Sequence, residues 1–161
     1  MLHPSDFSSE AAALVRSMTP EEKAAFCSGK SFWGTAGCER LGLSPIYVSD
    51  GPVGLRKQSG DADHLGLGVA LPATCFPSGA NLGSSWDPSL AEDMAAALAR
   101  ECRAHNVSVI LGPAINMKRS PLCGRNFEYF AEVQRLTPLF YVPCVAAVPS
   151  CGHVPTATLT A

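Results

Sequence analysis

Charge is scarce in this sequence of 161 residues. Only 16% of the residues are charged, and the formal net charge is −2. Proteins that bind the backbone of a nucleic acid or an anionic membrane surface concentrate Lys and Arg in a stripe or patch. The sequence has no such cluster, so we expect neither nucleic acid nor membrane as a partner.

Long apolar runs are also absent. Asp6, Glu10 and Arg16 interrupt the N-terminal stretch, which therefore lacks the hydrophobic segment of a secretory signal peptide. No later stretch is long enough to cross a bilayer. We therefore predict a cytoplasmic location for the chain.

Paired cysteine motifs are missing as well. The seven cysteines are odd in number, widely spaced and without a C-x-x-C pair, so neither a disulfide framework nor a zinc knuckle is indicated. We expect most of them to be small, partly buried hydrophobic residues. They are Cys27, Cys38, Cys75, Cys102, Cys123, Cys144 and Cys151.

The sequence is rich in hydrophobic residues, which form 47% of the chain and suffice for one core. Capping residues predict three helices: one begins near Ser9, one after Thr19, and one after Asp87 that ends near Asn106. The third helix should bury one apolar face. The residues predicted on that face are Leu90, Met94, Leu98 and Cys102.

Two short apolar runs, 46–49 and 107–111, are typical of buried strands, and each ends in a polar loop. The order strand, helix, strand favours a parallel α/β fold. In such folds ligands bind beside the loops that leave the carboxyl ends of the strands. The polar residues of these two loops are Asp50, Arg56, Lys118, Arg119, Arg125, Asn126 and Glu128.

Carboxylate and guanidinium groups suit the vicinal hydroxyls of a pyranose, because one accepts two hydrogen bonds and the other donates two. Aromatic rings could cover the C–H faces of the sugar. The candidate rings are Trp33, Phe127 and Tyr129. These residues alone predict a polyol-binding α/β domain.

Each candidate also has a structural interpretation. Asp50 could be a turn residue that bonds its own backbone, and Arg125 could pair with Glu128 or Glu132 to hold the loop. The rings could serve packing, and His105 could favour the dipole of the preceding helix. Both interpretations stay open from the residues alone.

Four stretches add a resemblance to a known family. "MTPEEKAAFCSG", "VSDGPVGLRKQ", "LPATCFPSGANLGSSWDPSLAEDM" and "NVSVILGPAINMKRSPLCGRNFEYFAE" together resemble the N-terminal barrel of glycoside hydrolase family 3, in particular its β-glucosidases. The resemblance covers about residues 9–132. A complete (β/α)8 barrel takes about 250 residues, so the expected fold is an incomplete TIM-barrel-like α/β domain.

The resemblance also implies a sugar subsite and a ligand. The positions that match the family's subsite for the terminal sugar are Asp50, Arg56 and Arg125. Lys118 and Arg119 match its "NIKR" pattern, where the resemblance implies a sugar contact less directly. The implied ligand is a β-glucoside or the end of a short β-glucan, without metal or organic cofactor. Three departures are mild changes of loop shape or packing. They are Val53, Ala114 and Met117.

The family pattern ends at Glu132, where the family continues with "DP", a helix, a strand and a sugar-binding Lys-His pair. Residues 133–161 carry one charged side chain, Arg135, and four prolines. We therefore predict two parts, a partial family 3 barrel over 1–132 and a divergent, poorly ordered tail over 133–161. An altered reading frame or a retained intron would explain the change.

Retaining glycosidases use two carboxyl groups about 5 Å apart, one as nucleophile and one as acid/base. In the family both lie beyond the stretch that this sequence matches, so the resemblance implies no catalytic residue in this chain. By family it is a retaining, exo-acting β-glucosidase, and the isolated chain is expected to be inactive. The alternatives are a non-catalytic sugar-binding module and a truncated product without function.

Overall fold

The structure, a computed structural model, describes residues 8–59, 68–132 and 156–159. The chain divides into two compact units, Met1–Tyr47 and Val48–Ala161. The second unit contains all three described strands and all the charged candidates for sugar binding, Asp50, Arg56, Lys118, Arg119 and Arg125.

The N-terminal unit contains α1 (Ser8–Ser17), α2 (Pro20–Phe26) and the short 3-10 helix η2 (Glu39–Leu41). Thr19 caps α2 as predicted: its hydroxyl accepts from the Glu22 N–H at 3.2 Å, and its own N–H donates to the Glu22 carboxylate at 2.9 Å. Arg40 joins the two helices, since it donates to the Ser17 carbonyl and to the carboxylate of Glu22.

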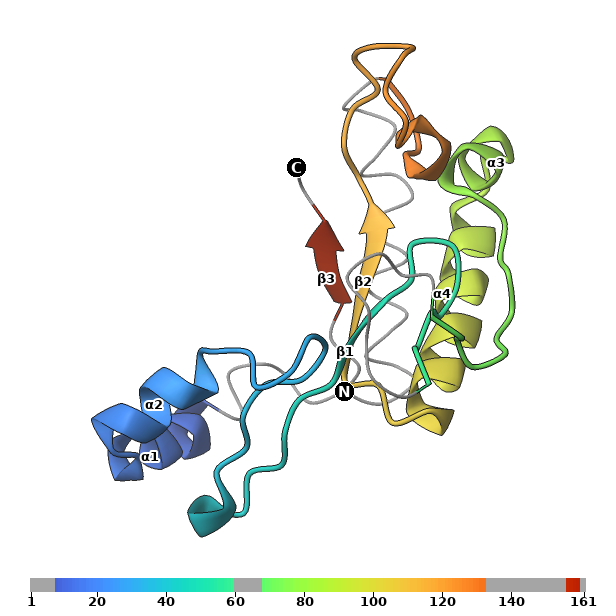
Figure 1. Cartoon of the computed structure of the whole chain (residues 1–161). Helices are drawn as coiled ribbons and strands as arrows, with labels where there is room; N and C mark the ends of the chain where they lie inside the picture. The colour runs from blue at the N-terminus through green and yellow to red at the C-terminus, as the bar shows by residue number, and fades with distance from the viewer. Residues whose placement is uncertain (1–7, 60–67, 133–155, 160–161) are drawn as a thin grey trace. The chain divides into compact units, whose positions relative to one another are not determined.

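The second unit is built on a parallel sheet in the order β1 (Val48–Asp50), β2 (Val109–Ala114) and β3 (Thr156–Leu159). The register pairs Asp50 with Leu111, and Leu111 with Ala157. The carboxyl ends of β1 and β2 therefore lie at the same edge, as Figure 1 shows. The predicted parallel α/β arrangement is confirmed.

The predicted boundary at Glu132 stays a prediction. Residues 133–155 and 160–161, which carry most of the predicted tail, lie outside the described residues. Thr156–Leu159, by contrast, forms β3 beside β2.

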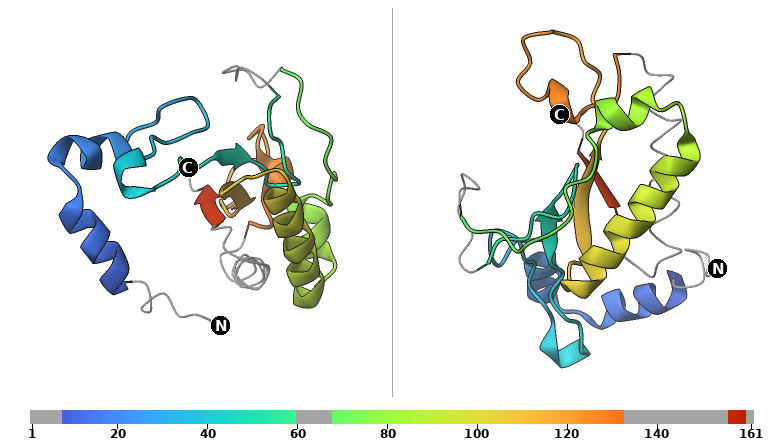
Figure 2. Two further views of the ribbon diagram at one scale, coloured as in Figure 1. Left: turned by 90° about the horizontal axis from the view of Figure 1, so that it is seen from below. Right: turned by 90° about the vertical axis from the view of Figure 1, so that its right-hand side faces the viewer.

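The main helix, α4 (Pro88–Ala104), runs alongside the sheet in the views of Figures 1 and 2. Asp87 caps it as predicted, with its carboxylate accepting from the Ser89 N–H at 2.9 Å. The predicted buried face is correct only in part: Cys102 is buried and Met94 packs, partly buried, against the core, whereas Leu90 is 45% exposed. The buried residues are Ala91, Ala95, Ala99 and Cys102. Their short side chains allow a close approach of the helix backbone to its neighbours, which a row of leucines would prevent.

Two short helices that the sequence did not reveal complete the unit, α3 (Gly79–Ser84) and the 3-10 helix η3 (Asn126–Glu128). A core cluster joins α3, α4 and the chain after η3. Its buried members are Leu82, Ala91, Ala95 and Phe130. Gly79 is required at the contact between the two short helices, because a Cβ there would lie 2.7 Å from the Glu128 carbonyl oxygen.

Candidate functional site

The loop after β1 places Asp50 and Arg56 together. Asp50 is the last residue of the strand, and its carbonyl accepts from the Arg56 N–H at 2.9 Å. Gly54 makes this turn possible with a φ of +136°, and a Cβ at Gly54 would collide with the Thr74 carbonyl. Asp50 is half-buried and Arg56 is exposed, so both can reach a ligand at this edge.

The loop after β2 carries the other candidates. The Lys118 N–H donates to the Ala131 carbonyl at 3.3 Å, which ties the start of the loop to its end. Lys118 is half-buried and Arg119 is exposed. The loop thus closes between Lys118 and Ala131, and Arg125 lies within it, directly before η3.

Arg125 pairs with Glu128. The Nε of Arg125 donates to Oε1 of Glu128 at 2.5 Å, and the guanidinium lies over the ring of Tyr129 at 5.9 Å from its centroid. This confirms the structural interpretation that Arg125 holds its own loop, with Glu128 as the partner. The Arg125 side chain is 49% exposed, so part of it remains accessible to a ligand.

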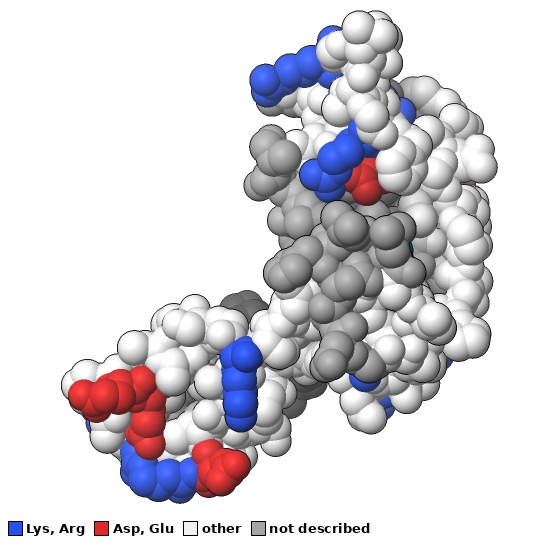
Figure 3. All heavy atoms as spheres, viewed as in Figure 1, with Lys and Arg blue, Asp and Glu red and all other residues white. Residues whose placement is uncertain are grey.

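Electrostatics links the two loops. The hydrogen bond to Glu128 is the main cause that raises the pKa of Arg125, and the negative charge of Asp50 adds a smaller contribution in the same direction. Carboxylates from both loops thus lie within electrostatic range of the guanidinium, which is protonated in proteins in any case. Figure 3 shows basic and acidic side chains side by side in this unit.

The three candidate rings differ in their surroundings. Tyr129 is 4% exposed, so its ring packs in the interior, and the packing interpretation is correct for it. Phe127 is 62% exposed and can meet a ligand. Trp33 belongs to the N-terminal unit, where its ring contacts that of Phe32 edge-on at 4.9 Å.

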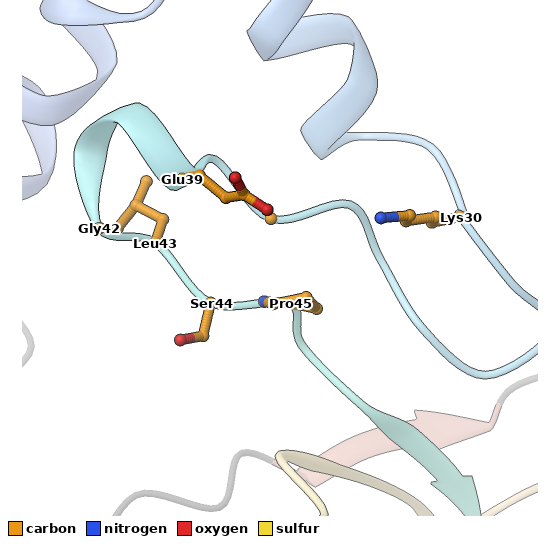
Figure 4. Close-up of a pocket in the computed structure, with 7 residues that line it drawn as sticks. Lys30, Glu39, Gly42, Leu43, Ser44 and Pro45 are labelled. Carbon is orange, nitrogen blue, oxygen red and sulfur yellow. The ribbon is translucent and has the colours of Figure 1, made fainter.

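A separate hollow of about 340 Å³ lies in the N-terminal unit and is drawn in Figure 4. It contains none of the predicted sugar-binding residues. Its lining consists of Lys30, Gly37, Glu39, Gly42, Leu43, Ser44 and Pro45.

Two kinds of feature do not occur in the described ranges 8–59, 68–132 and 156–159. No group of three or more His, Cys, Asp and Glu side chains there could hold a metal ion. No helix in these ranges has both the length and the apolar character needed to cross a membrane.

Sequence reasoning missed how completely Glu128 is buried. The spacing left Glu128 and Glu132 as equal partners for Arg125, whereas the structure buries the first and exposes the second. The signal that could have decided between them is the run of aromatic residues around Glu128, which draws this part of the loop into the core.

Comparison with known proteins places these observations in a family. The family model described as "Glycosyl hydrolase family 3 N terminal domain" matches residues 59–157. The match includes Lys118, Arg119 and Arg125, begins after Arg56, and continues beyond Glu132 into the predicted tail.

Curated relatives are similar over most of the chain. It is 52% identical over 139 residues to thermostable β-glucosidase B of Acetivibrio thermocellus. The matched region covers 86% of this chain and 18% of the relative. It is 43% identical to an exo-α-(1→6)-L-arabinopyranosidase of Bifidobacterium longum, with the same coverage of both chains. The chain thus spans less than a fifth of the length of these relatives and is a partial N-terminal segment.

Solved structures agree on the fold. A β-glucosidase from Kluyveromyces marxianus in complex with glucose superposes with a TM-score of 0.82 at 34% identity, over 92% of this chain and 17% of that one. The similarity confirms the predicted fold class, an incomplete TIM-barrel-like α/β domain. Because the family model matches well over half of its 161 residues, the chain belongs to glycosyl hydrolase family 3 and forms part of the N-terminal domain of that family.

Proposed function

We propose that the chain is the part of a family 3 β-glucosidase that helps to bind the terminal, non-reducing sugar. Asp50, Arg56 and Arg125 hold the sugar hydroxyls, and Lys118 and Arg119 make secondary contacts. The relatives support the substrate class, because several are named β-glucosidases and one solved structure is a complex with glucose.

The parallel pairing of β1 and β2 carries this proposal, because the loops with Asp50 and Arg125 follow the carboxyl ends of these two neighbouring strands. A carboxylate from one loop and a guanidinium from the next offer acceptors and donors at one edge of the sheet, the combination that a pair of vicinal hydroxyls requires.

The same residues are better suited to binding than to catalysis. A retaining glycosidase needs two carboxyl groups that reach the scissile bond from opposite sides. Glu128 is buried and engaged by Arg125, so it is not free to act on a substrate. We therefore assign no catalytic residue, and we expect the isolated chain to hydrolyse aryl β-glucosides no faster than buffer.

For the ligand, the partners, the location and the division of the chain, we propose what the sequence analysis predicts. The ligand is a β-glucoside or the end of a short β-glucan, nucleic acid is not a partner, and the location is cytoplasmic. Residues 1–132 form the partial barrel, and 133–161 form a divergent tail.

A chimera tests the site in a working enzyme. Residues 9–132 replace the matching segment of the Acetivibrio thermocellus enzyme, and we expect the chimera to hydrolyse an aryl β-glucoside. Asp50→Ala should lower kcat/KM by about 10- to 100-fold, because a hydrogen bond that involves a charged group is lost. Asp93→Ala, an exposed carboxylate of α4, is the matched control and should change little. Equal activities of the two variants would refute the assignment.

Titration of the isolated chain separates this proposal from a sugar-binding module. In a partial barrel, binding of glucose must itself order both loops, and the entropy lost in doing so weakens the affinity. Glucose should therefore bind in the millimolar range or more weakly and show no saturation at about 1 mM. Saturable sub-millimolar binding that disappears in both Asp50→Ala and Arg125→Ala would favour the module.

A further inference from the structure

Arg125 is held from its inner side by a buried carboxylate. The hydrogen bond from its Nε to Oε1 of Glu128 is the one that the guanidinium makes to a described residue, and the Glu128 side chain is only 7% exposed. A guanidinium has five N–H groups. Among the described residues, contact through Nε fixes the base of the group without using its four outer N–H groups, and the side chain is 49% exposed.

Glu128 is fixed by the core rather than by the loop. Its carbonyl packs against the first turn of α3, where Gly79 leaves room for it. Phe130, two residues later, belongs to the core cluster. The four residues before Arg125, 121–124, are exposed. The carboxylate is thus the rigid end of the pair, and the guanidinium is the end that needs support.

Support of this kind affects ligand affinity. A long arginine side chain on an exposed loop populates several rotamers, and a ligand that must select one of them loses affinity. Glu128 on one side, the Tyr129 ring at 5.9 Å and the charge of Asp50 all act on the same guanidinium. These contacts restrict Arg125 before any ligand arrives.

We propose that Glu128 is a positioning residue that holds Arg125 in the rotamer needed to bind pyranose hydroxyls, without touching the sugar itself. The inference rests on the proposed sugar-binding function. It assigns to Glu128 an effect on sugar affinity that a purely structural loop staple would not have.

The test uses the full 161-residue chain with 15N-labelled arginine and follows the Arg125 Nε–H signal by NMR. Glu128→Gln keeps the size and an acceptor oxygen but removes the charge, so solvent exchange of Nε–H should become about 10-fold faster. With glucose added up to about 200 mM, the Kd should rise about 5- to 10-fold. Glu132→Gln, the exposed carboxylate nearby, should change neither quantity.

Arg125→Lys provides a second variant, because it keeps the positive charge beside Glu128 but lacks the Nε–H. It should lose glucose affinity to the same extent as Glu128→Gln. Unchanged exchange in Glu128→Gln, or wild-type glucose affinity in either variant, would overturn the positioning role. If the wild-type chain does not respond to glucose but Glu128→Gln still accelerates exchange, Glu128 positions Arg125 and the proposed sugar-binding function is what fails.

Discussion

The two units of the chain each contain an arginine–glutamate ion pair with the same N–O distance, but the two pairs differ in burial. In the N-terminal unit Arg40 lies 2.5 Å from Glu22, and in the second unit Arg125 lies 2.5 Å from Glu128. The Glu22 side chain is 24% exposed and that of Glu128 is 7% exposed. The first carboxylate remains in contact with water, whereas the second depends on its arginine.

The arginines also differ in how many donors they use. Arg40 donates to both carboxylate oxygens of Glu22 and to the Ser17 carbonyl, so its fork is occupied within the protein. Arg125 uses Nε alone toward the described residues. The guanidinium of Arg40 therefore serves to join α1 and α2. That of Arg125 has donors that its contact with Glu128 does not use. The packing of the units differs likewise, since α2 has no buried residue and α4 has four.

The largest effect should come from the packed face of α4. Ala95 is buried in the core cluster, so Ala95→Leu should lower the free energy of unfolding by about 3 kcal/mol through overpacking. Leu90→Ala, on the exposed side of the same helix, should cost less than about 1 kcal/mol. Urea denaturation of the purified chain measures both. If Leu90→Ala lowered the free energy of unfolding more than Ala95→Leu, the face that contains Leu90 would be the buried one, as the sequence predicted.

Removal of Arg125 should come next. Arg125→Ala leaves the buried Glu128 carboxylate without its partner, and we expect a loss of about 2 kcal/mol in the free energy of unfolding. Arg40→Ala should be milder, because water can solvate Glu22. The comparison is made by urea denaturation at pH 7, and equal losses would contradict the distinction between the two pairs.

A smaller effect is expected at the cap of α2. Thr19→Ala removes the hydroxyl that accepts from the Glu22 N–H and should destabilise α2 by about 1 kcal/mol. Hydrogen exchange of the α2 amides reports this locally. Thr19→Ser keeps the acceptor and should remain close to the original sequence.

The smallest effect is a dependence on pH in the N-terminal unit. The hydrogen bond from Arg40, followed by that from the Thr19 N–H, lowers the pKa of Glu22 from 4.5 to about 2. A lowered folded-state pKa gives stability that is fully present above about pH 4.5 and is lost as the pH falls toward 2. Hydrogen exchange of α2 measured between these values should show the loss, and Glu22→Gln should remove the dependence. An identical pH profile in the variant would contradict the assignment to Glu22.

The sequence predicted features that depend on neighbouring residues. The caps at Thr19 and Asp87 were correct because a cap involves three or four consecutive residues. The short strands were placed within a few residues, and their parallel pairing followed from the helix between them. The face of α4 was correct only in part, at Cys102 and Met94, because periodicity alone favours the larger side chains, whereas the buried face consists mainly of alanines.

Features that depend on distant packing were not predictable. α3 was missed because glycine and serine form half of its six residues, although Ser78 caps it. β3 was missed because the prolines of the tail and the end of the family pattern concealed a short strand that only its partner β2 reveals. The choice of Glu128 as the partner of Arg125 depended on the burial of the residues that follow it.

The central claim is that the loops after β1 and β2 form one sugar subsite. A double-mutant cycle of Asp50→Ala and Arg125→Ala in the chimera with the Acetivibrio thermocellus enzyme tests it most directly, with kcat/KM on an aryl β-glucoside as the readout. The account predicts that each single variant loses about 10- to 100-fold and that the double variant loses at least about 10-fold less than the product of the two. Losses that multiply, or single variants as active as the unmodified chimera, would contradict it.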